Sequence, residues 1–96
     1  MAVQTEMKEA ADSGREDLIR TLAEHRVLPT TIEQSGSSLL GESSTSTYRF
    51  ESEASGESVA DRQTSARAAD TLGLTSGGDC ESVREEIQAH DAWGES

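Results

Sequence analysis

Residues 45–53 read Thr-Ser-Thr-Tyr-Arg-Phe-Glu-Ser-Glu. Successive side chains of an extended chain point to opposite faces, so Tyr48 and Phe50 share one face while Thr47, Arg49 and Glu51 share the other. An alternation of aromatic and polar side chains is typical of a strand with one buried face. It predicts a β-strand in the middle of a chain whose two ends have helical patterns.

Val27-Leu28 and Thr30-Thr31-Ile32 are the candidates for a weak partner strand. Two strands alone are marginally stable in water, so this hairpin has to lie on a helix or join a strand of another subunit. Sixteen of the residues in 30–58 are Ser, Thr or Gly, which is also the composition of a linker. The sequence therefore leaves open whether residues 34–46 are ordered.

The first 26 residues have the strongest helical pattern, with apolar side chains near a period of about 3.6 residues. These are Val3, Met7, Ala10, Ala11, Leu18, Ile19 and Leu22. Either Ser13 and Glu16 form a capping box that starts a second helix, or one continuous helix runs through Gly14. We favour two helices with a break near Ser13. Pro29 ends the second between residues 26 and 28, because it disfavours helical geometry just before it.

Residues 58–96 predict two more helices. Ser58 followed by Asp61 has the arrangement of an N-cap, and Gly73 suits the position just past the helix end, with Leu74 folding back. Asp79 is placed to cap the last helix. The two expected apolar stripes are Val59, Ala66, Ala69 and Leu72, and then Cys80, Val83, Ile87 and His90.

These elements predict an α+β fold in one small domain, residues 1–96. The domain has a helical N-terminal segment (1–28), a central Ser/Thr-rich β-hairpin or loop (29–57) and a C-terminal segment with two helices (58–96). Its core is expected to be marginal, since Leu, Ile, Val and Phe number only seven, three, four and one. Burying one large aliphatic side chain contributes about 1.5–3 kcal/mol, while ordering each residue costs about 1–2 kcal/mol.

The chain is strongly acidic and almost free of lysine. It has 19 Asp+Glu against 8 Lys+Arg, a net charge of −11, and Lys8 is its sole lysine. At about 1 M salt the Debye length falls to about 3 Å, so a surface of this kind suits a salt-rich cytoplasm. In composition alone the chain resembles halophilic archaeal proteins. A GC-rich mesophile, whose codons also favour Arg over Lys, is the alternative.

No pattern for catalysis or for a cofactor is present. Cys80 and the histidines His25 and His90 are the obvious candidates for chemistry, but acidic neighbours oppose a Cys80 thiolate, and the spacing to His90 and Asp91 matches no zinc site. We interpret Cys80 as a small apolar residue and both histidines as cations near helix C-termini. The chain is expected not to be an enzyme and to have no cofactor or metal.

The segment Ala66-Arg67-Ala68-Ala69-Asp70-Thr71-Leu72-Gly73-Leu74-Thr75 resembles the second helix and turn of helix-turn-helix proteins. The resemblance implies that residues 80–90 are a DNA-reading helix. Two departures weigh against it: the turn at residues 75–79 is long and Gly-rich, and Glu81, Glu85 and Glu86 repel phosphates. The acid is also spread over the chain, whereas binding of nucleic acid relies on clustered Lys and Arg.

The remaining candidates for function are contact residues. Trp93 follows the last helix, and aromatic side chains are enriched at interface hot spots. The expected interface residues are Tyr48, Phe50, Trp93, Leu18 and Leu22. A Sec-type leader and a membrane-length apolar run are missing from the sequence, so we expect a cytoplasmic or virion location and no membrane.

We therefore expect a non-catalytic protein-interaction or assembly subunit of a halophilic archaeon or its virus, which binds a protein partner or itself. A small virion structural or connector protein is a concrete version. Two alternatives stay open: a small helix-turn-helix-like transcription regulator or antitoxin, and a largely disordered acidic accessory protein.

Overall fold

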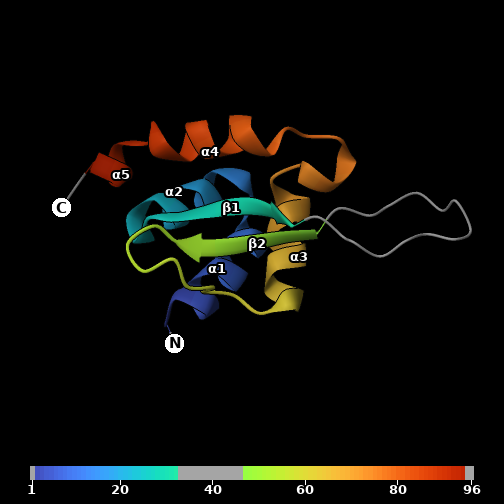
Figure 1. Cartoon of the computed structure of the whole chain (residues 1–96), viewed down its shortest axis with the longest axis horizontal. Helices are drawn as coiled ribbons and strands as arrows, with labels where there is room; N and C mark the ends of the chain where they lie inside the picture. Colours follow the sequence, from blue (N-terminus) through green and yellow to red (C-terminus); the bar gives the residue numbers. More distant parts are fainter. Residues whose placement is uncertain (1, 33–46, 95–96) are drawn as a thin grey trace, which may run out of the picture.

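The computed structural model describes residues 2–32 and 47–94. The elements follow one another in the order α1 (Ala2–Ser13), α2 (Arg15–His25), β1 (Val27–Ile32), β2 (Thr47–Ser52), α3 (Arg62–Thr71), the 3-10 turn η1 (Leu74–Ser76), α4 (Cys80–Gln88) and α5 (Asp91–Gly94). Helices and an antiparallel strand pair confirm the α+β fold class (Figure 1). The question of order in residues 34–46 lies outside the described residues.

The two strands pair in a register that places Pro29 opposite Phe50. Phe50 O accepts from Val59 N (2.9 Å) and Ser52 N donates to Glu57 O (3.0 Å), so these β2 groups point away from β1. Because antiparallel pairs alternate between bonded and non-bonded positions, Pro29 lies at a non-bonded one and its missing N–H costs the ladder nothing. The expected partner strand is thus confirmed, and it includes the proline.

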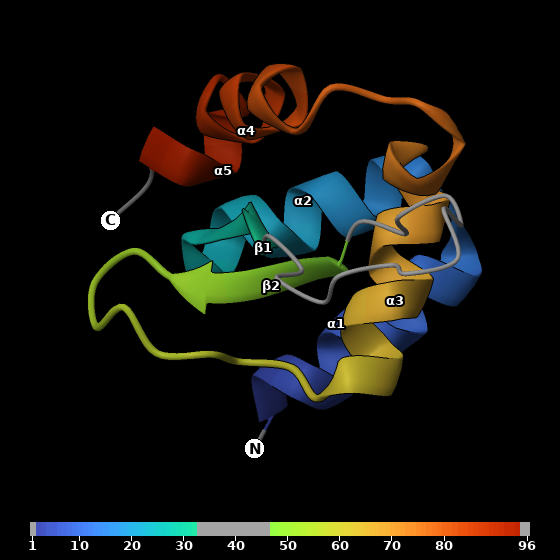
Figure 2. The same cartoon turned by 45° about the vertical axis from the view of Figure 1, so that its right-hand side comes forward.

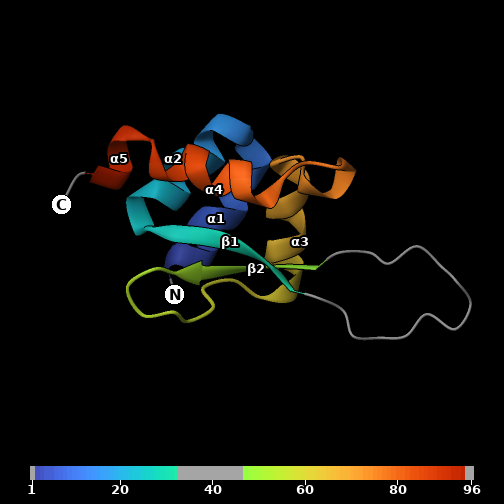
Figure 3. The same ribbon diagram turned by 45° about the horizontal axis from the view of Figure 1, so that its top comes forward.

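One face of this sheet packs on the helices. Phe50 is 0% exposed and Tyr48 is half-buried, whereas Arg49 between them is exposed. The period-2 prediction for β2 is confirmed. Figures 2 and 3 show the sheet lying against α1, α2 and α3, with α4 alongside β1.

The break between α1 and α2 falls where the sequence placed it, but for a different reason. Gly14 has φ 135° and ψ 174°, a conformation that disfavours any other residue, and it precedes α2 without a side-chain cap. The expected capping box is wrong. Ser13 ends α1, and its Oγ donates to Glu9 O at 3.1 Å instead of receiving the Glu16 amide.

Helix α2 is the centre of the core. It contacts α1, α3, α4, α5 and β1, and it buries Leu18, Ile19, Leu22 and Ala23. Small side chains line several of the facing surfaces: Ala10 and Ala11 on α1, and Ala68 and Ala69 on α3, are all buried. Alanine allows helix axes to approach closely, so a chain poor in large apolar residues still builds a continuous core.

The start of α3 lies later than the sequence suggested. Its N-cap is Asp61, whose Oδ1 accepts from Thr64 N at 2.7 Å. Ser58 is instead bridged to Glu51 beside the sheet. The shift changes the buried face: Ala68 is buried and Ala66 is exposed, which corrects the expected stripe.

The turn into α4 follows the sequence closely. Gly73 has φ 80° just past α3, Leu74 folds back and is 2% exposed, and Asp79 caps α4 by accepting from Glu81 N. Val83 and Ile87 are the buried residues of α4, and Cys80 and His90 are half-buried beside them.

The Asp61 cap predicts a pH-dependent stability. The hydrogen bond from Thr64 N holds the pKa of Asp61 below its ordinary value of 3.8. The cap therefore stabilises the folded chain fully above that value, and the stabilisation is lost as pH falls through the lowered pKa. Asp61→Asn keeps an oxygen acceptor but does not titrate. Urea unfolding should show wild type losing more stability than Asp61→Asn between about pH 5 and about pH 3; equal losses would contradict the assignment.

The docking of α4 depends on very few apolar groups, which makes it a direct test of the core. Ile87→Ala should lower the free energy of unfolding by about 2–5 kcal/mol, because it leaves a cavity at a fully buried site. Gln88→Ala, at the exposed neighbouring position, is the control and should stay within about 0.5 kcal/mol. Denaturant unfolding in about 2 M KCl, a salt level at which surface charges are screened, measures both. Similar values for the two variants would mean that α4 is not docked as described.

Candidate interaction surface

The face of the sheet opposite Phe50 lies open. We define the open face as Thr30, Ile32, Thr47, Arg49 and Glu51. Cross-strand partners lie on one face, and the register pairs Thr30 with Arg49 and Ile32 with Thr47. Leu28 shares this face through its pairing with Glu51, but it is 7% exposed and α4 contacts β1, so the Leu28 end of the face is covered and the exposed part begins at Thr30 and Glu51.

The open face exposes apolar surface. Ile32 is 37% exposed and is the single large hydrophobic residue in the exposed class among the described residues. Its neighbours Thr30 and Thr47 are half-buried threonines that present methyl and hydroxyl groups. A sheet face of this kind is suited to packing against another protein surface.

The charges of the open face balance. Arg49 Nε donates to Glu51 Oε2 at 2.6 Å, and the two side chains are 47% and 28% exposed. The described residues contain sixteen acidic and eight basic side chains, and the open face holds one of each. It is therefore a neutral patch on a molecule whose surface is otherwise acidic.

Three of the residues that the sequence assigned to an interface lie inside the chain's own core. Leu18, Leu22 and Phe50 are each 0% exposed. An amphipathic pattern shows which side chains are buried but not whether the covering surface belongs to the same chain. Since they offer no surface to a partner in this fold, the assignment of these three residues is corrected.

The other two expected interface residues also serve the fold. Tyr48 Oη donates to the carbonyl oxygen of Leu74 at 3.0 Å, which ties β2 to η1. Trp93 lies in α5, half-buried against the core, and α5 contacts α2. Neither side chain belongs to the open face.

The residues considered for chemistry, Cys80, His90 and His25, each have a polar partner within the chain. Cys80 Sγ lies 3.5 Å from the carbonyl oxygen of Pro29, and His90 Nδ1 accepts from Ala92 N at 3.1 Å. His25 lies in the last turn of α2, as the sequence suggested, and its Nε2 lies 2.6 Å from Glu6 Oε1, so it also joins α2 to α1. No group of three or more His, Cys, Asp and Glu in residues 2–32 and 47–94 is arranged to hold a metal.

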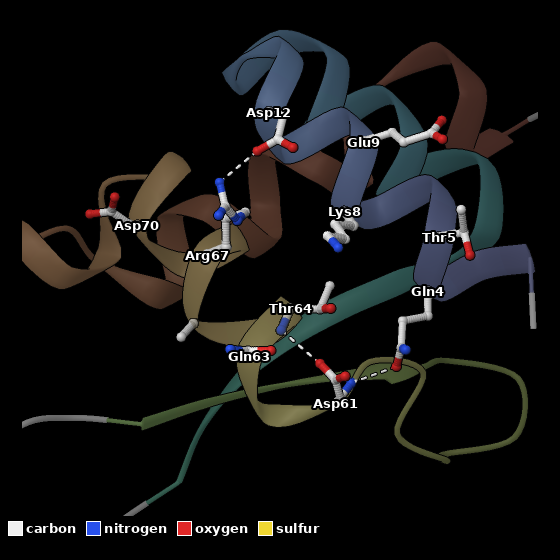
Figure 4. Close-up of a pocket in the computed structure, with 11 residues that line it drawn as sticks. Gln4, Thr5, Lys8, Glu9, Asp12, Asp61, Gln63, Thr64, Arg67 and Asp70 are labelled. Atoms are coloured by element: carbon white, nitrogen blue, oxygen red, sulfur yellow. Dashed lines mark hydrogen bonds and ion pairs between the residues drawn. The ribbon is translucent and has the colours of Figure 1, made fainter.

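A groove with a volume of about 920 Å³ runs between α1 and α3 (Figure 4). Two of its carboxylates have partners within the chain: Arg67 Nη1 donates to Asp12 Oδ1 at 2.6 Å, and Asp61 Oδ1 accepts from Thr64 N. Gln4 Oε1 accepts from Asp61 N at 2.7 Å. The Arg67–Asp12 and Asp61–Gln4 bonds join α3 and its N-cap to α1. We therefore interpret the groove as the packing boundary between these two helices.

The helix-turn-helix-like segment corresponds to α3, η1 and α4. The exposed side of α4 presents Glu81, Arg84 and Glu85, and Glu86 is bonded to Arg15 through both carboxylate oxygens (2.6 and 2.8 Å). The Arg15 guanidinium lowers the pKa of Glu86, so this carboxylate stays charged. A reading helix would meet DNA phosphates with this acidic side, which opposes binding.

Comparisons with protein-family models, with curated proteins and with solved structures gave no match. None of the helices in the described part of the chain combines the length and the apolar character needed to cross a bilayer.

Sequence reasoning missed Ile32 and Thr30 as site residues. Both were assigned only to the partner strand of the hairpin. The spacing of Leu28, Thr30 and Ile32 could have shown that these residues share one face of the strand, the face opposite Pro29. Which of them is exposed depends on the register and on what covers that face.

Removing the hydroxyl oxygen of Tyr48 tests its structural role. Tyr48→Phe removes the bond to Leu74 O and keeps the ring, so it should lower the free energy of unfolding by about 0.5–1.5 kcal/mol. Self-association, measured by sedimentation, should stay unchanged. If Tyr48→Phe left the stability unchanged but abolished self-association, Tyr48 would be an interface residue and the structural assignment would be wrong.

Proposed function

We propose that this chain is a non-catalytic protein-interaction subunit that assembles with another protein surface through the open face. The observation that carries the proposal is a sheet with one face packed on the chain's own helices, while on the other face, within residues 2–32 and 47–94, Ile32 and Arg49 are exposed. A two-stranded sheet is marginal by itself, so covering its second face with protein adds stability by mass action.

The charge pattern supports an association site here. A molecule of net charge −11 repels other acidic proteins over most of its surface. The open face contributes no net charge, because Arg49 and Glu51 neutralise each other at 2.6 Å. An acidic partner therefore meets less repulsion at this patch than at the acidic parts of the surface.

The near absence of lysine supports a salt-rich setting for this assembly, in a halophilic archaeon or its virus. In concentrated salt the general repulsion between acidic proteins is screened, while apolar contact at Ile32 persists. A small structural or connector protein of a virion is a concrete version of this role.

Photo-crosslinking tests the proposal. A photoreactive amino acid at position 32 should trap one defined protein in extracts of the source cells, whereas the same group at position 66, exposed on α3, should not. The trapped protein is then purified and titrated against the chain. Ile32→Glu should weaken the affinity at least about tenfold, since it places a charge in an apolar contact.

Ala66→Glu is the matched control and should leave the affinity unchanged, because position 66 lies on α3 and outside the open face. Equal trapping at both positions, or an Ile32→Glu chain that binds as wild type does, would overturn the proposal.

A further inference from the structure

The open face combines features that suit one particular partner. It carries one cation and one anion, Arg49 and Glu51, two residues apart on β2 and on the same face. A two-fold axis brings residue i of one copy to residue j of the other and j to i. Suppose that the open faces of two copies pack against each other. A two-fold axis that lies between the two sheets, perpendicular to the strands and level with Phe50, then sets Arg49 of each copy opposite Glu51 of the other.

We propose that the protein that covers the open face is a second copy of this chain, in a two-fold dimer held by exchanged Arg49–Glu51 pairs. This inference rests on the proposed function and names its partner.

The hydrogen-bonding capacity for the exchange is present on each side chain. The bond within one chain uses Arg49 Nε and Glu51 Oε2. Arg49 has two further nitrogens with N–H groups, and Glu51 has a second oxygen, Oε1. Each side chain can therefore keep its own partner and also bind the opposite charge of the second copy.

The same axis crosses β1 at Pro29, which pairs with Phe50 in the register. It sets Thr30 of one copy opposite Leu28 of the other. Leu28 is 7% exposed and belongs to the core of its own chain, so the contact rests on β2, and Ile32 lies at its rim.

The charge balance of the open face also favours association with a second copy at this patch. Two chains of net charge −11 repel each other, and the contact least affected is one that is neutral on both sides. The patch has five residues, against roughly 20–30 a side in a stable complex. The dimer is therefore expected to be weak and dependent on protein concentration.

Charge exchange at two positions tests the dimer. Arg49→Glu gives two acids on the face, and Glu51→Arg gives two bases. Each variant alone should lose self-association by at least about tenfold in sedimentation equilibrium, since like charges then face each other. An equimolar mixture of the two variants should associate again, because each supplies what the other lacks. Recovery in the mixture also shows that both variants are folded.

Two variants on α4 control for net charge. Arg84→Glu and Glu85→Arg change the charge by the same amounts at exposed positions outside the open face. If bulk repulsion alone governs association, Glu51→Arg and Glu85→Arg, which make the chain less acidic, both associate better than wild type. The dimer instead requires Glu51→Arg to associate worse while Glu85→Arg does not. The measurements use the lowest KCl concentration at which circular dichroism shows the wild-type helix content.

Three results would overturn the dimer: a wild-type chain that stays monomeric up to millimolar concentration, single variants that associate as wild type does, or a mixture that fails to recover although both variants keep the wild-type dichroism. The crosslink at position 32 separates this failure from that of the proposed function. An adduct of twice the chain mass of 10.2 kDa supports the dimer, and an adduct with a different protein keeps the proposed function while removing the second copy.

Discussion

The packing of α2 is the constraint on which the rest of the structure depends. Fifteen Leu, Ile, Val and Phe residues are too few to build several cores, so one helix has to pack against most of the other elements. Leu18 and Leu22 are 0% exposed, and α1, α3, α4, α5 and β1 all contact α2. Alanines on α1 and α3 make this possible, because small side chains let helices approach until the few large ones are covered from every side.

Hydrogen-bonded pairs of polar side chains lie where these layers meet. His25–Glu6 joins α2 to α1, Arg67–Asp12 joins α3 to α1, and Arg15–Glu86 joins α2 to α4. Each pair is partly exposed, so each contributes little energy by itself, and less still in high salt. Their position at the rims of helix contacts favours a role in setting which faces meet, while burial of Val83, Ile87 and the alanines supplies the stability.

The two faces of the hairpin have different environments. Phe50 and Pro29 complete the core, and the opposite row of Thr30, Ile32 and Arg49 stays at the surface. A large interior would have covered both faces with helices, but this chain has too little apolar material for a second layer. The exposure of Ile32 and Arg49 on that face, within the described residues, is thus a consequence of the small core, and the proposed assembly uses this exposed surface.

The amino-acid sequence by itself determined the strand at residues 47–52, the helix break before α2, and the turns at Gly73 and Asp79. These follow from local causes: side-chain alternation, glycine conformation and capping chemistry. Tertiary structure alone decided that Leu18, Leu22 and Phe50 are covered by their own chain and that Ile32 is exposed. A periodic pattern marks which face of an element avoids water, but only the contacts between distant segments determine what covers that face, and which face is left for a partner.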